Sequence, residues 1–209
     1  MRLMSKGSII LLNGTSSVGK TTLARAIQDD SPTPVQHISL DQFRDGMAGR
    51  YRGMNSHDNE PGARGLNIVP VNGMTQLRFG DVGLLTLRGM RRAASAFAAT
   101  GIDVVVDDLL LEPDFLRDYL EVFAGFDVTF VGVHCDLDTL MAREDERPGR
   151  FPGTAAAHFK QVHVGCEYDV EVNTGNTSPR ECAERVLAAS RDLRSPSAFE
   201  RMRVGEHSA

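Results

Sequence analysis

The stretch LNGTSSVGKTT, Leu12–Thr22, continues the short apolar run SIILL and carries the strongest signal in the chain. From Gly14 to Thr21 it fits the pattern G-x-x-x-x-G-K-[ST], with an expected strand before it and an expected helix after it. Glycine adopts backbone angles that strain other residues, so successive N–H groups can turn inward around an anion. The positive end of the following helix adds to this attraction. The stretch therefore predicts a phosphate-binding loop; the alternative is an ordinary turn between a strand and a helix.

The residues of this loop have expected roles toward a nucleoside triphosphate, and ATP is the expected nucleotide. The Lys20 ammonium is expected to contact the β and γ phosphates, and the Thr21 hydroxyl to bind Mg²⁺. Ser16 and Ser17 can add hydrogen-bond donors. The full set of expected nucleotide-binding residues is Gly14, Thr15, Ser16, Ser17, Val18, Gly19, Lys20, Thr21 and Thr22.

Apolar runs alternate along the chain with segments of helical periodicity. Strands are expected at 9–13, 35–40, 102–108, 128–133 and 170–172, and helices at 20–29, 75–100, 113–123, 136–143, 154–163 and 178–193. Gly80, Gly83 and Gly89 argue against an unbroken helix over 75–100. The alternation predicts an α/β fold, a doubly wound parallel sheet of five strands with helices on both faces. Ligands of such sheets bind at the carboxyl ends of the strands.

The length of 209 residues suits one domain, expected at 1–193, followed by a polar, loose tail at 194–209. A net charge of −5 without a basic patch argues against a nucleic-acid partner. Three widely spaced cysteines, no leader-like segment and no stretch of membrane-spanning length favour a cytoplasmic protein with no membrane partner. Residues 45–73 are rich in Gly, Arg and Asn without a sustained period, so a long functional or disordered loop is expected there. Monomer and homo-oligomer both stay open.

Carboxylates stand at the expected ends of two strands. Asp107 and Asp108 close the run IDVVV, where a carboxylate would serve Mg²⁺; the choice between them is open, and a strand-end turn is the alternative role. Asp41 follows the second expected strand, where it would orient or deprotonate an acceptor hydroxyl beside the γ-phosphate. The rival role for Asp41 is the N-cap of a helix over 42–47.

Residues 143–153 read REDERPGRFPG and combine arginines with Gly and Pro breaks. The part at 144–153 is typical of a lid that closes over phosphates, in which Arg147 and Arg150 would stabilise charge on the transferred group. A solvated loop with internal ion pairs is the alternative, because three acidic residues lie among the arginines. The chain has no N-K-x-D signature of a guanine-binding GTPase, which leaves the small kinases.

The stretches IILLNGTSSVGKT, VVVDDLLL, FVGVHCD and GCEYDVEVNT make the sequence resemble the chloramphenicol phosphotransferase family, from Ile10 to about Leu187. These are small P-loop kinases that phosphorylate the primary hydroxyl of the antibiotic. The resemblance implies a nucleoside-monophosphate-kinase-like fold with a short lid, and ATP with Mg²⁺ as cofactors. By the same resemblance the catalytic set is Asp41 as base, Lys20, and the lid arginines Arg147 and Arg150, with Thr21, Asp107 and Asp108 toward the metal.

The segment 44–76 departs from the family, because it is polar where the family is richer in apolar residues. Acceptor binding is expected within 45–74, and Arg50, Arg52 and Arg64 hint at an anionic or sugar-like acceptor, unless they are ordinary surface residues. The expected activity is ATP-dependent transfer of the γ-phosphate to a hydroxyl of a small molecule, with chloramphenicol or a related antibiotic as one candidate. A nucleotide-sugar kinase of the zeta-toxin type and a non-catalytic ATP-binding regulatory module are the alternatives.

Overall fold

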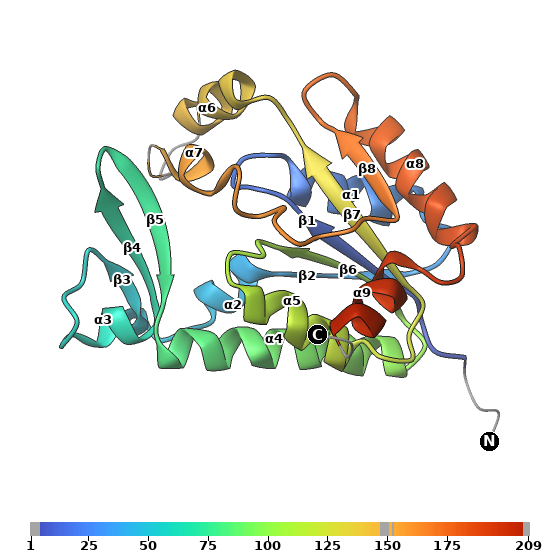
Figure 1. Cartoon of the computed structure of the whole chain (residues 1–209), viewed down its shortest axis with the longest axis horizontal. Coiled ribbons are helices and arrows are strands. Elements are labelled where there is room, and N and C mark those ends of the chain that lie inside the picture. Colours follow the sequence, from blue (N-terminus) through green and yellow to red (C-terminus); the bar gives the residue numbers. More distant parts are fainter. Residues whose placement is uncertain (1–4, 147–150, 152, 207–209) are drawn as a thin grey trace.

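Five parallel strands form the central sheet of the computed structural model, which describes residues 5–146, 151 and 153–206. Their order is β2 (Val35–Ser39), β6 (Asp103–Asp108), β1 (Ile9–Asn13), β7 (Val128–His134) and β8 (Val170–Asn173) (Figure 1). Each neighbouring pair runs parallel. Residues of β1 are buried on both faces, as the unbroken apolar run IILL predicts. The predicted doubly wound sheet is confirmed.

Helices cover both faces of this sheet and divide the apolar core into two layers. One layer holds α1 (Lys20–Asp30) and α8 (Pro179–Arg191), which pack together against one face. The other layer holds α4 (Asp81–Ala99), α5 (Pro113–Val122) and α9 (Ala198–Glu206). The phosphate-binding loop follows β1, the middle strand of the sheet. The strands on its two sides, β6 and β7, lead into helices on opposite faces of the sheet, so the loop emerges where these connections diverge. Open α/β sheets bind their ligands at such a point.

A second, smaller sheet stands beside the main one, where the sequence predicted a loop. It consists of β3 (Arg52–Met54), β4 (Leu66–Val71) and β5 (Met74–Phe79), in that order (Figure 1). The prediction of no regular structure at 45–73 was therefore wrong. The signal it missed is the pair Asn72-Gly73, both at positive φ (51° and 76°), which closes β4 and β5 into an antiparallel hairpin.

The helix predicted at 75–100 is also wrong at its start. The residues up to Phe79 belong to the strand β5, and α4 begins only at Asp81. Beyond that point α4 is unbroken despite its glycines. Gly83 is required by close packing, because a Cβ at this position would lie 2.4 Å from the carbonyl oxygen of Gly65. Only glycine therefore lets α4 approach the chain at Gly65, next to the start of β4. Short elements complete this region: α2 (Leu40–Asp45), a 3₁₀ turn at Gly49–Tyr51, and α3 (Pro61–Arg64).

Two further differences concern the C-terminal third. The helix expected at 154–163 is the five-residue α7 (Thr154–His158) followed by turns; α6 (Leu137–Asp145) precedes it. The tail expected to be loose contains α9, which is held by Phe199 against Phe123 and Phe130. The polar composition of 194–209 concealed this single aromatic anchor.

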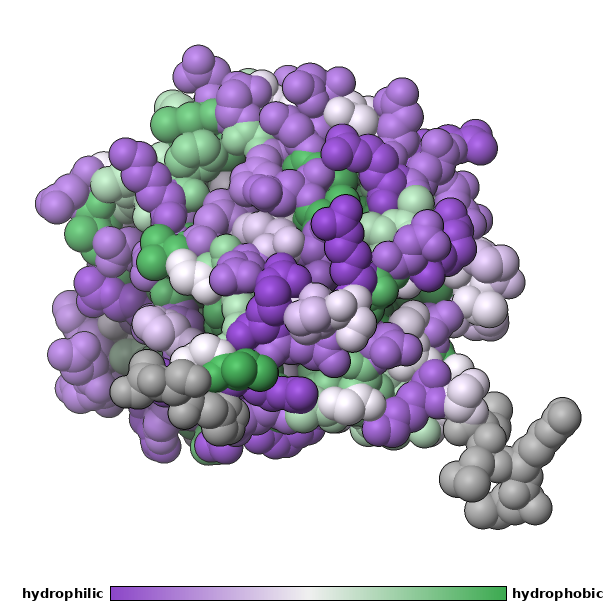
Figure 2. Space-filling model, turned by 45° about the vertical axis from the view of Figure 1, so that its right-hand side comes forward, coloured by the Kyte–Doolittle hydropathy of each residue, from purple (hydrophilic) through white to green (hydrophobic). Residues whose placement is uncertain are grey.

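The face of the molecule seen in Figure 2 is largely hydrophilic, with apolar side chains scattered in small areas. Within residues 5–146, 151 and 153–206, none of the helices combines the length and the apolar character needed to cross a membrane.

Candidate active site

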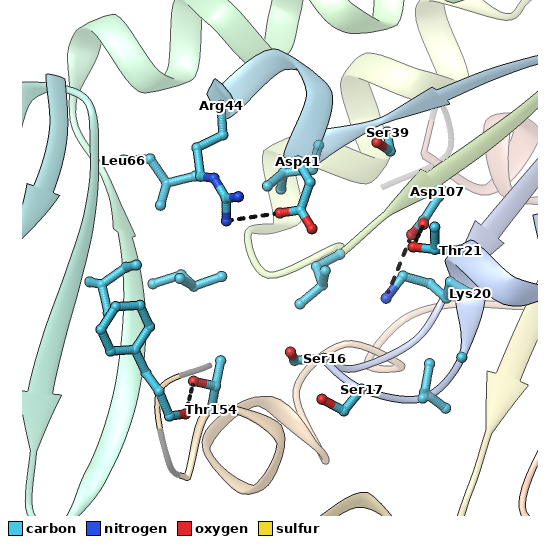
Figure 3. Close-up of a pocket in the computed structure, with 17 residues that line it drawn as sticks. Ser16, Ser17, Lys20, Thr21, Ser39, Asp41, Arg44, Leu66, Asp107 and Thr154 are labelled. Atoms are coloured by element: carbon cyan, nitrogen blue, oxygen red, sulfur yellow. Dashed lines mark hydrogen bonds and ion pairs between the residues drawn. The ribbon is translucent and has the colours of Figure 1, made fainter. Parts of the chain in front are cut away.

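A cleft of about 300 Å³ opens at the carboxyl ends of the central strands, between the phosphate-binding loop and the small sheet (Figure 3). The loop, α2 and the end of β6 supply its polar groups, and β4 and β5 supply an apolar wall. The lining residues are Ser16, Ser17, Val18, Gly19, Lys20, Thr21, Ser39, Leu40, Asp41, Arg44, Leu66, Ile68, Leu77, Asp107, Leu109, Phe151 and Thr154.

The loop has the backbone shape of an anion cradle. Gly19 takes a φ of 95°, and a Cβ on Gly14 would lie 2.5 Å from the carbonyl oxygen of Val133, so both glycines are required. Ser17 also lies at positive φ (61°), and its buried hydroxyl has no hydrogen-bond partner among the described residues. Buried polar groups are rarely left unsatisfied, so this hydroxyl fits an incoming phosphate oxygen. The cradle and the orphaned hydroxyl together fit a nucleotide phosphate.

The Lys20 ammonium lies inside the cradle. Its Nζ donates to the carbonyl oxygens of Gly14 (2.7 Å) and Thr15 (3.0 Å) and stands 3.8 Å from Asp107 Oδ1. The cation is therefore held against the backbone of the loop. Of the nine residues expected to bind nucleotide, those from Ser16 to Thr21 line the cleft. Thr15 is instead buried, with its hydroxyl donating to the Ala155 carbonyl, and Thr22 is exposed.

The two strand-end carboxylates have separate surroundings. Asp107 Oδ2 accepts from the Thr21 hydroxyl (2.6 Å), and His37 Nε2 lies 3.8 Å from the same oxygen. Burial opposes ionisation of Asp107, but His37, the Lys20 charge and the Thr21 hydroxyl together hold its pKa below the ordinary value. A hydroxyl and an ionised carboxylate are ligands that suit Mg²⁺.

Asp108 does not line the cleft. It is fully buried, and its oxygens accept from Tyr119 Oη and the Leu109 amide, both at 2.8 Å. Burial raises the pKa of this carboxyl. The two adjacent aspartates thus point to opposite sides of β6, as the alternation of a strand requires.

Asp41 faces the cleft from the first turn of α2 (Figure 3). The N-cap of this helix is Ser39, whose hydroxyl accepts from the Gln42 amide while the Gln42 side chain accepts from the Ser39 amide. Asp41 is therefore not the cap, and the rival role is excluded. Its Oδ1 lies 3.0 Å from Arg44 Nη1, on the same face of α2.

The wall opposite the phosphate loop is apolar. Leu66, Ile68 and Leu77 project into the cleft from β4 and β5, and Phe151 joins them. The three arginines of the segment that hinted at an anionic acceptor do not line the cleft. Arg64 pairs with Asp81, Arg52 lies near Asp45, and Arg50 lies over the ring of Tyr51.

The segment expected to act as a lid is described only at its ends, and Arg147 and Arg150 lie outside the described residues. Glu144, at the end of α6, joins those ends. Its buried carboxylate accepts from the amides of Gly153 (2.8 Å) and Ala155 (3.0 Å) at the start of α7. An acidic residue beside arginines resembled a solvated ion pair in the sequence, so this role was missed.

Two other groups at the site, Arg44 and the apolar wall, were also not predicted from the sequence. Arg44 could have been found from its i,i+3 spacing to Asp41. The apolar wall could have been found from the alternation of Leu66 and Ile68 and from the Asn72-Gly73 turn signal.

The fold and the loop define a class of protein, that of the P-loop α/β proteins. The chain aligns with Mycobacterium tuberculosis APS kinase CysC in complex with AMPPNP and APS at a TM-score of 0.61 and 16% identity, covering 88% of this chain and 97% of that chain. It aligns with a gluconokinase from Sinorhizobium meliloti 1021 at a TM-score of 0.59 and 19% identity, covering 92% and 96%. At these identities the likeness concerns the fold.

The sequence narrows the class further. The pattern of the chloramphenicol phosphotransferase-like proteins matches residues 7–191, and the chain belongs to that family. A protein of Mycobacterium tuberculosis H37Rv named "Putative O-phosphotransferase Rv2636" is 32% identical over 207 residues, covering 96% of this chain and 89% of that protein. Its counterpart in strain CDC 1551 matches to the same extent. The resemblance seen in the sequence is confirmed.

Proposed function

We propose that the protein is an ATP-dependent O-phosphotransferase, which moves the γ-phosphoryl group of ATP to a hydroxyl of a small molecule. The observation that carries this proposal is the arrangement of one cleft. Lys20, Thr21 and Asp107 lie on its phosphate side, and Asp41 faces the same space from α2 (Figure 3). A regulatory module that only binds ATP has no need of a carboxylate at that place.

In this proposal the loop amides and Ser17 bind the phosphates, and Lys20 neutralises charge on the β and γ groups. Thr21 and Asp107 would hold Mg²⁺, which would supply positive charge beside the phosphates. Asp41 orients the acceptor hydroxyl and takes its proton as the new O–P bond forms and the bond from Pγ to the bridging oxygen of ADP breaks. Arg147 and Arg150 of the lid at 144–153 remain proposed contributors to charge stabilisation.

The apolar wall favours an acceptor with an uncharged, apolar body and one reactive hydroxyl. Leu66, Ile68 and Leu77 suit such a body, and burying an anion against them would be unfavourable. Chloramphenicol is a neutral aromatic alcohol and is the first acceptor we would test. A nucleotide-sugar acceptor has less support, since Arg44 is the one described cation on this side of the cleft and already pairs with Asp41 and Asp45.

The test is a mass-spectrometric assay with Mg²⁺, ATP and chloramphenicol, beside a pool of hydroxylated metabolites. We expect a phosphorylated product, and we expect Asp41→Asn to lower turnover by about 100-fold or more while ATP affinity stays within about twofold. Asp45→Asn is the matched control, because Asp45 belongs to the same helix and touches Arg44 but does not line the cleft.

The outcomes separate the parts of the proposal. Full activity in Asp41→Asn would refute the assignment of the base. A phosphorylated metabolite with unmodified chloramphenicol would keep the reaction and reject the antibiotic as acceptor. Binding of ATP with no product from any acceptor would favour the regulatory module.

A further inference from the structure

Helix α7 touches three parts of the site, although it has only five residues. The Ala155 carbonyl accepts the Thr15 hydroxyl of the phosphate loop (2.9 Å), and the Ala155 amide donates to Glu144. At the other end of the helix, His158 Nε2 accepts the backbone N–H of Leu77 in β5 (3.2 Å). The helix therefore joins the phosphate loop to the apolar wall of the cleft.

The hydrogen bond from Leu77 to His158 satisfies a backbone N–H group at the edge of the small sheet. β5 is an edge strand of the small sheet, with β4 on one side only, and an edge leaves backbone N–H groups without a ladder partner. His158 is buried (4% exposed) and satisfies one of these groups. The packing at the start of α7 is equally close, because a Cβ on Gly153 would lie 2.9 Å from Met74 Cα.

The geometry also defines the state of the ring. Since Nε2 accepts a backbone N–H, it carries a lone pair, and the neutral ring has its proton on Nδ1. Burial lowers the pKa of His158, opposed in part by Gln161, which agrees with a neutral ring. A buried histidine of this kind is usually a structural residue. This one accepts a hydrogen bond from Leu77 of β5, and the side chain of Leu77 lines the cleft.

We propose that His158 is a positioning residue, which holds the acceptor wall through Leu77 and, through α7, couples that wall to the phosphate loop. The proposal rests on the proposed function, because it takes ATP to bind at the phosphate loop and the acceptor to bind at the apolar wall. Phosphate bound at Ser16 and Ser17, which follow Thr15 in the loop, tightens the loop on Ala155, and α7 transmits this to β5. Coupling of two ligand sites needs a physical element that both bias, and α7 is that element.

The test uses a pair of polar substitutions that differ in reach. The amide oxygen of Gln can occupy the place of His Nε2, whereas that of Asn reaches only the place of Nδ1. Amide exchange of the full-length protein is followed by NMR, with and without AMPPNP and Mg²⁺. We expect Leu77 N–H to exchange about tenfold faster in His158→Asn than in the native protein, and His158→Gln to restore most of the protection.

The nucleotide gives the decisive comparison. AMPPNP with Mg²⁺ should slow exchange at Leu77 in the native protein and in His158→Gln, and should have no effect there in His158→Asn. Equal exchange in all three proteins, or a nucleotide effect that survives in His158→Asn, would overturn the coupling. An unchanged Leu77 in native protein whose loop amides shift on nucleotide addition would do the same.

The proposed function fails in a different way. If AMPPNP shifts none of the loop amides, nucleotide binding is refuted and the coupling with it, while the exchange rates without nucleotide still decide whether His158 holds Leu77. His57→Gln, an exposed histidine of the same region that does not line the cleft, should leave Leu77 unchanged in every condition.

Discussion

At the scale of single residues, surroundings rather than residue type separate the ionisable groups. Asp107 and Asp108 are neighbours in the sequence, yet the pKa of the first is lowered and that of the second is raised. The reason is the direction of each side chain. Asp107 meets Lys20 and Thr21, whereas Asp108 enters the core beside Tyr119. Of the two aspartates, which the sequence left undecided, only Asp107 lines the cleft, and we therefore propose Asp107 rather than Asp108 for Mg²⁺.

His163 offers a test of pH dependence at the same scale. Its Nδ1 lies 2.6 Å from Tyr168 Oη, and its ring stacks on that of His134 at 4.3 Å. Burial, followed by the charge of His134, lowers the pKa of His163 to about 4. The unfolded chain binds this proton near pH 6.5, so the native state binds fewer protons between pH 6.5 and 4 and loses stability as the pH falls.

We predict that His163→Gln reduces this loss. The native protein should lose less than about 1.4 kcal/mol per pH unit on account of His163, because solvent screens a partly exposed ring. Urea unfolding at pH 7, 6 and 5 measures the slope, with the exposed His57→Gln as control. A slope identical in native protein and His163→Gln would show that His163 titrates normally in the fold.

At the scale of elements, the apolar wall of the cleft depends on short segments that have little stability of their own. α7 has five residues, fewer than an isolated helix needs, so its neighbours must hold it. Glu144 does so from α6, by accepting from the first amides of α7. The small sheet is held in a similar way by contacts with α4 and α7.

We predict that Glu144→Ala destabilises the protein by about 3 kcal/mol, because it leaves two amides at a buried site without their charged acceptor. Glu144→Gln keeps one acceptor oxygen and should cost about half as much. Glu146→Ala, an exposed acid two residues on, should change stability by less than about 0.5 kcal/mol. Urea unfolding gives the three values, and equal values for Glu144→Ala and Glu146→Ala would contradict the buried role.

At the scale of the whole molecule, the chain closes its core with a helix from its C-terminal end. Phe199 of α9 is 5% exposed, and its ring lies 5.4 Å from that of Phe130 on β7 and 6.3 Å from that of Phe123. Residues near the end of the chain thus cover the face of the sheet that α4 and α5 leave open. The contact could not be read from local pattern, since the partners lie about seventy positions earlier.

We predict that Phe199→Ala lowers the free energy of unfolding by about 3 kcal/mol, as loss of a buried aromatic ring does. The cleft is formed by other elements, so ATP affinity at 20 °C should stay within about twofold. Val204→Ala, on the exposed side of α9, is the matched control and should cost less than about 0.5 kcal/mol. Thermal unfolding and a nucleotide titration on each variant decide the matter.

The sequence by itself determined the central sheet, the phosphate-binding loop and the family, because each follows from a local pattern. Apolar runs between helical segments predict the sheet, the spacing of Gly and Lys predicts the loop, and short characteristic stretches indicate the family. Tertiary structure alone decided which aspartate faces the cleft, and that Arg50, Arg52 and Arg64 do not line it. Each of these depends on where a side chain points after distant segments have packed. Such packing energies arise between residues far apart in the chain, so no local pattern encodes them.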